Sequence, residues 1–518
     1  MMAQIQYAEF LDKIRGCWAG KNIGGTLGAP MEGRMEMNDV TFYTQELHGV
    51  PAPNDDLDLQ LVWLAAVEVY GLDGITPRRL GEYWDQAIIA PCSEYAVCKM
   101  NVANGIMPPL SGAVNNDRFK YSNGAWIRSE IWACLCPGAP DEAIRYAYMD
   151  SCADHCEEGI WAEMFTVALQ SAAFVENDMH KLIGIALSKV PAESRLAAAV
   201  RCVVDGYDRH LPWQTVRGML LERFVVEQYR AAVNIGFVII GLLYGEGDFD
   251  RSVCLAVNCG DDTDCTGATV GALFGILRGR SGIPSRWLEP IGEGISTICI
   301  NHFGFVFLYG LPQTLEALSL RTARAAVAAA GGNPYLLRIT DAPTSLPPDH
   351  TEKMLGSDEA RRYWSMPLFC MDFPLSYAVL RVEYPDGIEA APGSSLKMIF
   401  TVGDSIHVNA VIGLRWRNLP EGWSGEPAAL EFSLRADSCN AVSMTLNVGE
   451  FPDTMAYPEL EVSLRGRRVP EILLIPVQRA GTVFYTRGRE GELAYRCRRR
   501  MEAAKACGFT LENNTPQI

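Results

Sequence analysis

The chain has 518 residues, of which 48% are hydrophobic, and its formal net charge at pH 7 is −17. This length predicts two or three domains with an ample hydrophobic core. The acidic balance argues against generic binding to nucleic acids or anionic membranes, since both need basic patches. No apolar run is as long as a membrane span, and the N-terminus lacks the pattern of a signal peptide. We therefore expect a cytoplasmic protein whose 16 cysteines are reduced and serve as small core residues rather than zinc ligands.

Apolar residues recur at helical spacing through the first two thirds of the chain. The spacing is clearest at residues 57–70, 160–174, 196–204, 231–243 and 268–277. An alanine-rich stretch ending at Gly332 predicts a further helix with a glycine C-cap. We therefore assign residues 1–345 to one all-α domain.

The hydrophobic period changes after a proline-rich junction at residues 342–348. Apolar and polar residues then alternate, which predicts strands with one buried face. The alternation is clear at residues 396–402, 442–448 and 460–464. We expect a linker at 346–370, a smaller immunoglobulin-like β-sandwich at 371–480, and a tail at 481–518 that can hold one short helix.

Two clusters of acidic residues each precede a long apolar stretch that reads as a buried helix. The clusters comprise Asn54, Asp55, Asp56 and Asp58 in the first, and Asp261, Asp262, Asp264 and Cys265 in the second. Within each cluster, alternate aspartates are expected to project to one side. One such cluster alone would be a helix cap. Two clusters, with more carboxylates than caps can use, favour a two-metal site because a hard divalent cation relieves their repulsion.

Four motifs occur in a fixed order along the helical part. They are R-G-C-W-A-G-K-N-I-G-G-T-L-G-A-P-M-E-G at 15–33, N-D-D-L at 54–57, D-S-C-A-D-H-C-E-E-G-I-W-A-E-M-F at 150–165, and D-D-T-D-C at 261–265. Through these motifs, residues 8 to about 330 resemble the ADP-ribosylglycohydrolase family. The resemblance implies an all-α fold around a binuclear magnesium centre. The predicted β-sandwich lies outside the resemblance and is an appended module.

The resemblance also implies which residues bind metal. Two Mg²⁺ ions, or Mn²⁺ in their place, are expected at Asn54, Asp55, Asp56, Asp262, Asp264 and Cys265. Asn54 and Cys265 stand where the family has threonines, and Gly25 stands where it has an aspartate. Asn54 can still offer a carbonyl oxygen, whereas a thiol is a soft ligand that suits a hard cation poorly. We therefore expect one metal position to be weaker, or to be completed by water.

Glu32 matches the family's glutamate, which implies a catalytic role. Cleaving a glycosidic bond develops positive charge on the ribose ring carbon and needs an activated water on the opposite face, and a carboxylate can act as the base. The resemblance places His155 in the substrate pocket, although a lone histidine is commonly structural. The small-residue loop with Ser111, Gly112 and Asn115 can approach phosphate or ribose through backbone N–H groups, and an ordinary turn is an equal alternative.

Two classes of function remain open from the sequence. The first is a metal-dependent hydrolase that acts on an ADP-ribosylated substrate, with a variant that acts on a nucleoside or simple sugar. An appended β-sandwich favours that variant by association alone. The second is a non-catalytic protein that binds ADP-ribose or a nucleotide, which the changes at Gly25, Asn54 and Cys265 favour. Four retained aspartates and Glu32 argue for the enzyme. The acceptor, the anomer and the oligomeric state are left open.

Overall fold

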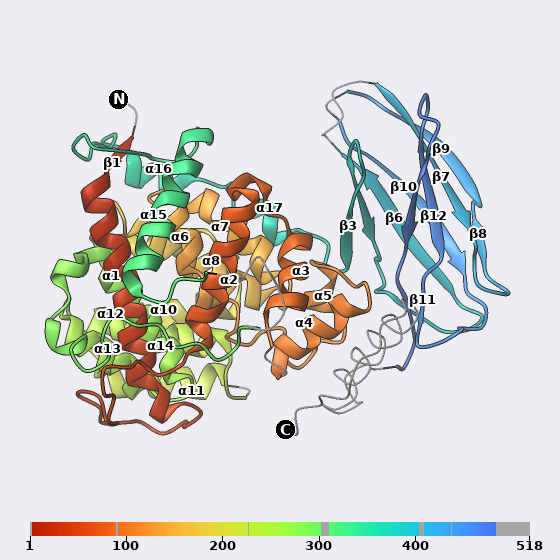
Figure 1. Cartoon of the computed structure of the whole chain (residues 1–518). Coiled ribbons are helices and arrows are strands. Elements are labelled where there is room, and N and C mark those ends of the chain that lie inside the picture. Colours follow the sequence, from red (N-terminus) through yellow and green to blue (C-terminus); the bar gives the residue numbers. More distant parts are fainter. Residues whose placement is uncertain are drawn as a thin grey trace, which may run out of the picture.

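The computed structural model describes residues 3–89, 92–225, 227–301, 310–403, 409–436 and 438–482. They form a helical domain with a β-sandwich at its side (Figure 1). The short helix expected in the C-terminal tail falls beyond residue 482, outside the described residues. None of the described helices combines the length and apolar character needed to cross a membrane.

The helical domain confirms the predicted all-α fold. Its helices are α1 (Tyr7–Gly28), α2 (Asp55–Tyr70), α3 (Pro77–Ala87), α4 (Ser93–Ala103), α5 (Leu110–Ala113), α6 (Glu130–Leu135), α7 (Pro140–Ser151), α8 (Glu158–Ala172), α9 (Met179–Ser188), α10 (Arg195–Asp208), α11 (Trp213–Phe224), α12 (Ala231–Tyr244), α13 (Phe249–Asn258), α14 (Thr263–Arg278) and α15 (Leu315–Gly332). The two ends of the domain meet where β1 (Gln4–Gln6) pairs in parallel with β2 (Arg338–Thr340). The C-cap of α15 is Asn333 in an extended conformation, so the predicted glycine cap is wrong.

Helix α2 passes through the interior of the helical domain. Every residue from Asp56 to Val67 is buried. A helix that is apolar on nearly all sides gains from burial on all sides, unlike an amphipathic surface helix. Its polar first turn, which carries Asp55 and Asp56, is therefore drawn inside the domain with it.

Helices α1 and α14 lie antiparallel, in direct backbone contact along a row of glycines. A Cβ added at Gly20 would lie 1.9 Å from the carbonyl oxygen of Gly271, and one at Gly24 would lie 2.0 Å from that of Gly267. Glycines spaced four residues apart lie on one helix face, so no side chain separates the two backbones. This contact places the start of α14 beside the end of α1.

We expect the substitution Gly20→Ala to lower the free energy of unfolding by about 3 kcal/mol or more, because backbone atoms cannot yield to the added methyl group. Gly218→Ala is the matched control, since an added Cβ on the exposed face of α11 meets nothing within 4 Å. It should raise stability by up to about 1 kcal/mol through helix propensity. Denaturant unfolding of both variants measures the difference. Equal stability of Gly20→Ala and the unaltered protein would contradict the close contact.

The C-terminal part forms the predicted β-sandwich. Its strands are β3 (Cys370–Pro374), β4 (Val379–Glu383), β5 (Glu389–Ala390), β6 (Ser395–Val402), β7 (Ala410–Arg417), β8 (Ser424–Glu426), β9 (Ala429–Leu434), β10 (Asn440–Asn447), β11 (Met455–Ala456), β12 (Glu459–Leu464), β13 (Glu471–Leu474) and β14 (Val477–Arg479). The two larger sheets are antiparallel, with strand orders β3-β4-β6-β10-β8 and β13-β12-β7-β9, and a small third sheet has the order β11-β14-β5.

The two larger sheets pack their apolar faces together. Leu396, Met398, Phe400 and Val402 alternate along β6 and are all buried, as the period of two predicts. The ring of Phe400 meets that of Trp416 on β7 edge to face, with centroids 6.0 Å apart. The side chains that the sequence pattern assigned to one face therefore form the interior of the sandwich.

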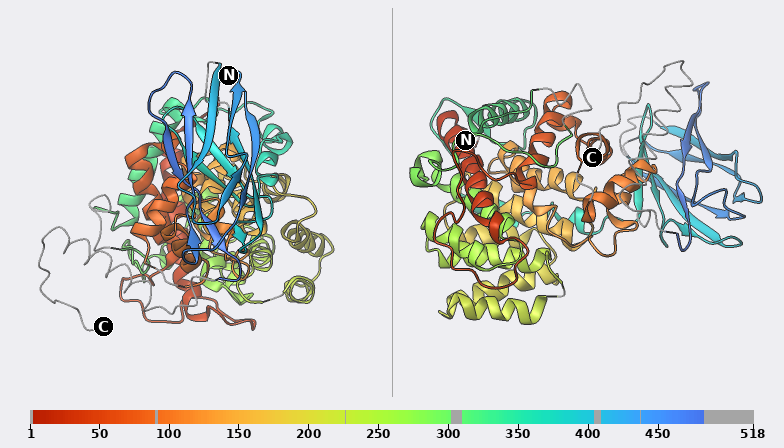
Figure 2. Two further views of the ribbon diagram at one scale, coloured as in Figure 1. Left: turned by 90° about the vertical axis from the view of Figure 1, so that its right-hand side faces the viewer. Right: turned by 60° about the horizontal axis from the view of Figure 1, so that its bottom comes forward.

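The segment between the domains, expected to be a linker, holds two short helices, α16 (His350–Gly356) and α17 (Arg361–Trp364). Both contact the helical domain: the Nε2 atom of His350 lies 3.1 Å from the carbonyl oxygen of Gly138, and the indole N–H of Trp364 donates to the carbonyl oxygen of Lys189. The sandwich itself lies beside α3, α4 and α5 (Figures 1 and 2).

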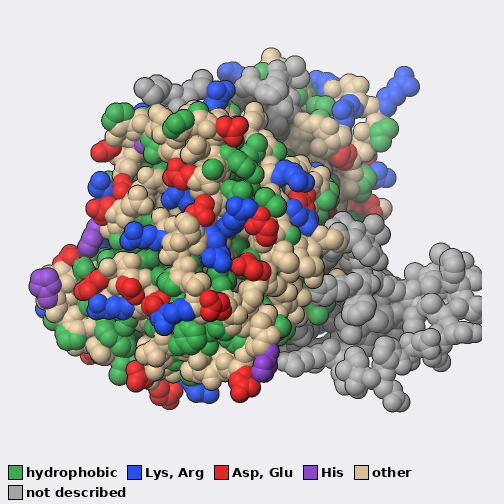
Figure 3. All heavy atoms as spheres, turned by 60° about the vertical axis from the view of Figure 1, so that its left-hand side comes forward, with side chains coloured by type: hydrophobic (Ala, Val, Ile, Leu, Met, Phe, Trp, Pro, Cys, Tyr) green, Lys and Arg blue, Asp and Glu red, His purple; other side chains and the backbone are tan. Residues whose placement is uncertain are grey.

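The surface of the helical domain carries charges of both signs. On the face that is turned forward from the left of Figure 1, acidic, basic and hydrophobic side chains are interspersed (Figure 3). Among the described residues on that face, no block of one charge stands out. A concentration of acidic side chains lies inside the domain, at the site described next.

Candidate metal centre and active site

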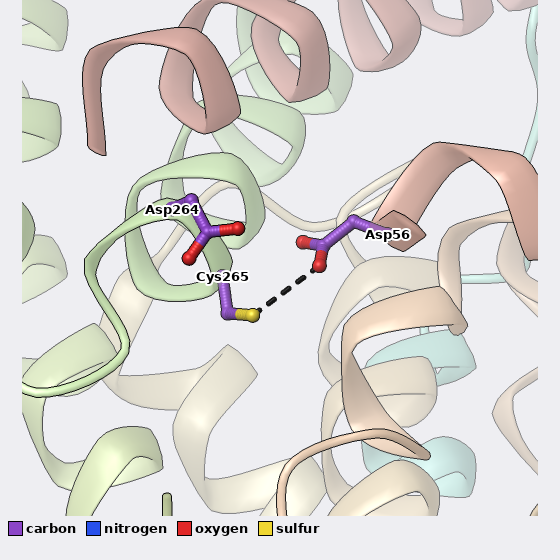
Figure 4. Close-up of side chains that lie close together, drawn as sticks. All are labelled: Asp56, Asp264 and Cys265. Carbon is purple, nitrogen blue, oxygen red and sulfur yellow. Dashed lines mark hydrogen bonds between the residues drawn. The ribbon is translucent and has the colours of Figure 1, made fainter. Parts of the chain in front are cut away.

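The two acidic clusters meet inside the helical domain, at the facing N-termini of α2 and α14. The thiol of Cys265 donates to the Oδ1 atom of Asp56 at 3.2 Å, and Asp264 points toward the same carboxylate (Figure 4). The amide nitrogen of Asn54 lies 3.4 Å from the Oδ2 atom of Asp264. The glycine contact between α1 and α14 and the buried path of α2 together produce this meeting.

The converging side chains form two overlapping groups of possible metal ligands. One group is Asp56, Asp264 and Cys265, and the other is Glu32, Asp262 and Asp264. In each group the ligand atoms lie within 4.8 Å of one another. The second group offers oxygen only, which is the donor set that Mg²⁺ and Mn²⁺ prefer.

The loop after α1 brings Glu32 to this site. The backbone N–H of Gly33 donates to the carbonyl oxygen of Asp261 at 2.8 Å, and the N–H of Asp261 donates to that of Arg34 at 2.6 Å. This pairing ties the loop to the residue before the second cluster. Glu32 remains exposed, but its carboxylate loses part of its hydration at this site, and this desolvation and the neighbouring carboxylates of Asp55 and Asp56 raise its pKa.

The burial of Asp264 tests whether the site suits a cation. Its side chain is 6% exposed, and its Oδ1 atom has no hydrogen-bond partner. Burial raises the pKa of Asp264, and the charges of Asp262 and Asp56 add to the effect. A buried carboxylate oxygen without a partner is costly, and a bound cation removes that cost. The residues present therefore fit a hard divalent cation.

The other two aspartates of the site each accept one hydrogen bond from a residue that the sequence motifs did not reveal. The amide of Asn123 donates to the Oδ2 atom of Asp262 at 2.6 Å, and the hydroxyl of Tyr95 donates to the Oδ2 atom of Asp55 at 3.0 Å. Burial raises the pKa of Asp262 to about 8. Burial, together with the charge of Asp56, raises the pKa of Asp55 to about 6.

Lys21 of α1 is the most consequential residue that the sequence analysis missed. It is 2% exposed, and its Nζ atom lies 3.0 Å from the Oδ2 atom of Asp56 and 3.1 Å from the Oε1 atom of Glu130. Burial disfavours the charged ammonium, but Asp56 and Glu130 outweigh burial and hold its pKa above the ordinary value. The signal in the sequence was a lone lysine between small and apolar residues of the first motif.

Asn54 serves as the N-cap of α2. Its side-chain oxygen accepts the backbone N–H of Asp56 at 2.7 Å, as capping asparagines do, and its amide nitrogen turns toward Asp264. A Cβ at Gly25 would lie 2.4 Å from that amide nitrogen, so the amide fills space that a side chain at this position would need. In this arrangement Asn54 directs a donor, rather than a ligand oxygen, at the site.

Two further aspartates of the clusters have other partners. Asp58 was expected on the same side as Asp56, but its Oδ2 atom accepts the backbone N–H groups of Ile298 and Cys299 at 2.6 Å each. The expectation is wrong because α2 already includes Asp56, and residues two apart on a helix face different ways. Asp261 accepts hydrogen bonds from the backbone N–H of Tyr229 and from the side-chain amide of Asn234, and these bonds hold its loop in place.

A cavity of about 490 Å³ opens over this site. Glu32, Asp55, Asp262, Asp264 and Cys265 line one part of it. Other lining residues are Arg118, Phe119, Tyr229 and Arg230, which add positive charge and aromatic surface. A larger cavity of about 1440 Å³ lies against α7 and α16 and contains none of the predicted site residues.

His155 lies behind the wall of the smaller cavity. It is fully buried, its Nδ1 atom lies 2.9 Å from a carboxylate oxygen of Asp154, and its Nε2 atom lies 3.0 Å from the hydroxyl of Ser122, which lines the cavity. Arg128 contacts Asp154 through two nitrogens and anchors the pair. His155 therefore reaches the cavity through Ser122, and its contact with substrate stays a prediction.

Ser111, Gly112 and Asn115 do not line the smaller cavity. The hydroxyl of Ser111 donates to the carbonyl oxygen of Ala153 at 2.6 Å. Asn115 exchanges two side-chain hydrogen bonds with Gln478 of the β-sandwich. A Cβ at Gly112 would lie 2.2 Å from the carbonyl oxygen of His155. The geometry gives these three residues packing and interface contacts, and substrate binding by them stays a prediction.

Clustered carboxylates beneath a cavity are a kind of site that metal-assisted hydrolases use. The sequence profile of the ADP-ribosylglycohydrolase family matches residues 6–326, which is more than half of the chain. This chain belongs to the ADP-ribosylglycohydrolase family, and membership implies a hydrolase. The chain is also similar to an uncharacterized protein of Archaeoglobus fulgidus, with 23% identity over 303 residues, covering 54% of this chain and 92% of that protein.

The raised pKa values predict how metal binding depends on pH. Asp55 and Asp262, with pKa values of about 6 and about 8, hold protons in the folded protein that the unfolded chain has released above about pH 4. Without a cation, the free energy of unfolding should therefore fall as pH rises from about 4 to about 8. A cation must displace these protons, so its affinity should rise over about pH 6 to 8.

We accordingly expect Mg²⁺ to raise the melting temperature more at about pH 8 than at about pH 6. Thermal unfolding in chelator and in excess Mg²⁺, at matched ionic strength, measures the difference. Calorimetry in two buffers of different ionisation enthalpy should show that protons are released on binding. If Mg²⁺ raised the melting temperature by the same amount at both pH values, the raised pKa values of Asp55 and Asp262 would be contradicted.

Proposed function

We propose that this protein is a metal-dependent glycohydrolase that cleaves the N- or O-glycosidic bond of an ADP-ribosylated substrate. The observation that carries the proposal is the convergence of Glu32, Asp55, Asp262 and Asp264 on one cavity. The cavity lies in the domain whose sequence places the chain in the family. The proposal therefore rests on a site with the required chemistry as well as on similarity.

The proposed role of Glu32 is to orient and deprotonate the attacking water. Departure of the leaving group develops positive charge on the ribose carbon, and water must attack from the opposite face. A general base works best when its pKa lies near the working pH. In the protein without a bound cation, desolvation and the carboxylates of Asp55 and Asp56 raise the pKa of Glu32, and a cation nearby would lower it. Its position on a loop that lines the cavity supports this role.

The aspartates would hold the cation that this chemistry needs. Glu32, Asp262 and Asp264 offer an oxygen-only group for Mg²⁺, or for Mn²⁺, and Asp56, Asp264 and Cys265 form the other group. A bound divalent cation supplies positive charge that favours ribose hydroxyls and lowers the pKa of coordinated water. The resemblance to the family implies two such ions.

The cavity supports a nucleotide-like substrate. Its volume of about 490 Å³ lies in the range of small-molecule sites. The guanidinium groups of Arg118 and Arg230 line it, and guanidinium groups bind phosphate oxygens strongly. Phe119 and Tyr229 add aromatic surface on which a base or a sugar can pack. This combination suits a phosphorylated sugar better than a simple neutral one.

The test is a hydrolysis panel with the full chain, run in Mg²⁺, in Mn²⁺ and in chelator. The panel contains ADP-ribose linked to a guanidino group and to a hydroxyl group, a nucleoside, and simple glycosides. Release of ADP-ribose that chelator abolishes is the expected result. Turnover restricted to nucleosides or sugars would support the glycosidase alternative. Binding of ADP-ribose without turnover of any substrate would instead support a non-catalytic binding protein.

A further inference from the structure

The two groups of possible ligands differ in how many of their oxygens are already engaged. In the group of Asp56, Asp264 and Cys265, the Oδ1 atom of Asp56 accepts the Cys265 thiol and its Oδ2 atom pairs with the Lys21 ammonium. The Oδ2 atom of Asp264 faces the amide of Asn54. The Oδ2 atom of Asp56 and the Oδ1 atom of Asp264 both lack a hydrogen-bond partner, but the Asp56 oxygen is engaged in the ion pair with Lys21. Asp264 also belongs to the oxygen-only group with Glu32 and Asp262.

A network of buried side chains holds Lys21 in place. The ammonium donates hydrogen bonds to Glu130 and to the carbonyl oxygen of Ile127, and it makes an ion pair with Asp56. Glu130 in turn accepts from Gln60 at 2.8 Å and from Gln170 at 3.0 Å. Because Glu130 is satisfied on both oxygens and fully buried, the ammonium is positioned by the fold.

We propose that Lys21 acts as a built-in cation in the Asp56 group, so that the centre binds one divalent ion, in the group of Glu32, Asp262 and Asp264. This inference rests on the divalent-cation site of the proposed function and replaces the expectation of two ions. An ion on Asp56 would have to displace Lys21 from the carboxylate and bring like charges together in a buried site. It would also have to accept a thiol, which is a poor ligand for a hard cation.

The charges at the site also favour a single divalent ion, in addition to the engaged carboxylate oxygens. The site carries the carboxylates of Asp55, Asp56, Asp262 and Asp264, and the buried Nζ atom of Lys21 lies 3.0 Å from one of them, that of Asp56. The remaining ion then lies where donors are fewest, on oxygens that include the unpaired Oδ1 atom of Asp264. Lys21, Asn54 and Cys265 thus share one consequence, since each directs a donor group at the carboxylates of Asp56 or Asp264.

Manganese binding to the full-length, chelator-treated protein tests the inference. Calorimetry should give one Mn²⁺ per chain, and electron paramagnetic resonance of the saturated protein should show the signal of an isolated ion. Two ions per chain with a magnetically coupled signal would overturn the inference while leaving the proposed function intact. Binding of no ion would overturn both, so the two failures are distinguishable.

A second experiment removes the Lys21 ammonium. The double variant Lys21→Met with Cys265→Thr vacates the Asp56 group and restores an oxygen, so it should bind two Mn²⁺ ions per chain. Lys13→Met with Cys265→Thr is the matched control, because Lys13 is also buried on α1 but its Nζ atom donates to the carbonyl oxygen of Ile276. The control should still bind one ion. One ion in a folded Lys21→Met double variant would overturn the role of Lys21, and if that variant does not fold, the stoichiometry of the unaltered protein decides.

Discussion

Asp262→Asn is expected to abolish the stabilisation of this protein by divalent cations. Asp262 stands in the oxygen-only ligand group at the N-cap position of α14, where its side chain makes no capping hydrogen bond, and asparagine retains the shape of the side chain while removing the charge. We expect the affinity for Mn²⁺ to fall by more than about 100-fold, beyond the range for residues that only support a ligand. In chelator the variant should be at least as stable as the unaltered protein at pH 8, because it lacks a buried carboxylate with a raised pKa.

Asp248→Asn is the control for this result. Asp248 is also an N-cap aspartate, at the start of α13, but it is exposed and lies outside the cavity. Its substitution should leave the response to Mg²⁺ unchanged. Thermal unfolding with and without Mg²⁺, together with Mn²⁺ calorimetry, measures both variants. Retention of the full Mg²⁺ response by Asp262→Asn would show that the ion lies elsewhere.

Glu32→Gln is expected to lower kcat by about 100- to 10,000-fold on the true substrate, the usual range for the loss of a general base. Glutamine keeps the size and an oxygen of the side chain and removes the basic group. Because Glu32 also lies among the ligand atoms of the oxygen-only group, turnover has to be measured at saturating Mg²⁺. Under that condition the affinity for ADP-ribose should stay close to that of the unaltered protein.

Glu36→Gln provides the comparison for Glu32. Glu36 is an exposed glutamate of the same loop and does not line the cavity. Turnover by this variant should match that of the unaltered protein. If Glu32→Gln also keeps the full rate at saturating Mg²⁺, the base is a different group, and the aspartates that line the cavity are the next candidates.

The β-sandwich is joined to the helical domain by specific contacts. Asn115 and Gln478 exchange side-chain hydrogen bonds, and the hydroxyl of Tyr457 donates to the carbonyl oxygen of Asn104. Asn104 ends α4, the helix that also carries Tyr95, whose hydroxyl contacts Asp55 of the site. The sandwich thus contacts the C-terminal end of α4, and the first turn of the same helix lines the cavity.

Much of the architecture could be predicted from the sequence because it is encoded locally. Helical spacing marked α2, α8, α10, α12 and α14, and the change to a period of two marked the strands of the sandwich. The periodicity of apolar residues reflects the face that each element buries, so it can be read without a tertiary fold. The ordered motifs also led to the family, which the match over residues 6–326 establishes.

The sequence by itself determined the chemistry available at the site: carboxylates before two buried helices, a thiol and an amide in place of hydroxyls, and a glutamate in the first motif. Only the tertiary structure decided which of these atoms are engaged. Lys21 of α1 makes an ion pair with Asp56, and the amide nitrogen of Asn54 points to Asp264. Asp58 accepts a hydrogen bond from a loop that is far away in the sequence. The physical reason is that ligand type is a property of one residue, whereas a free lone pair depends on every donor that folding brings within reach.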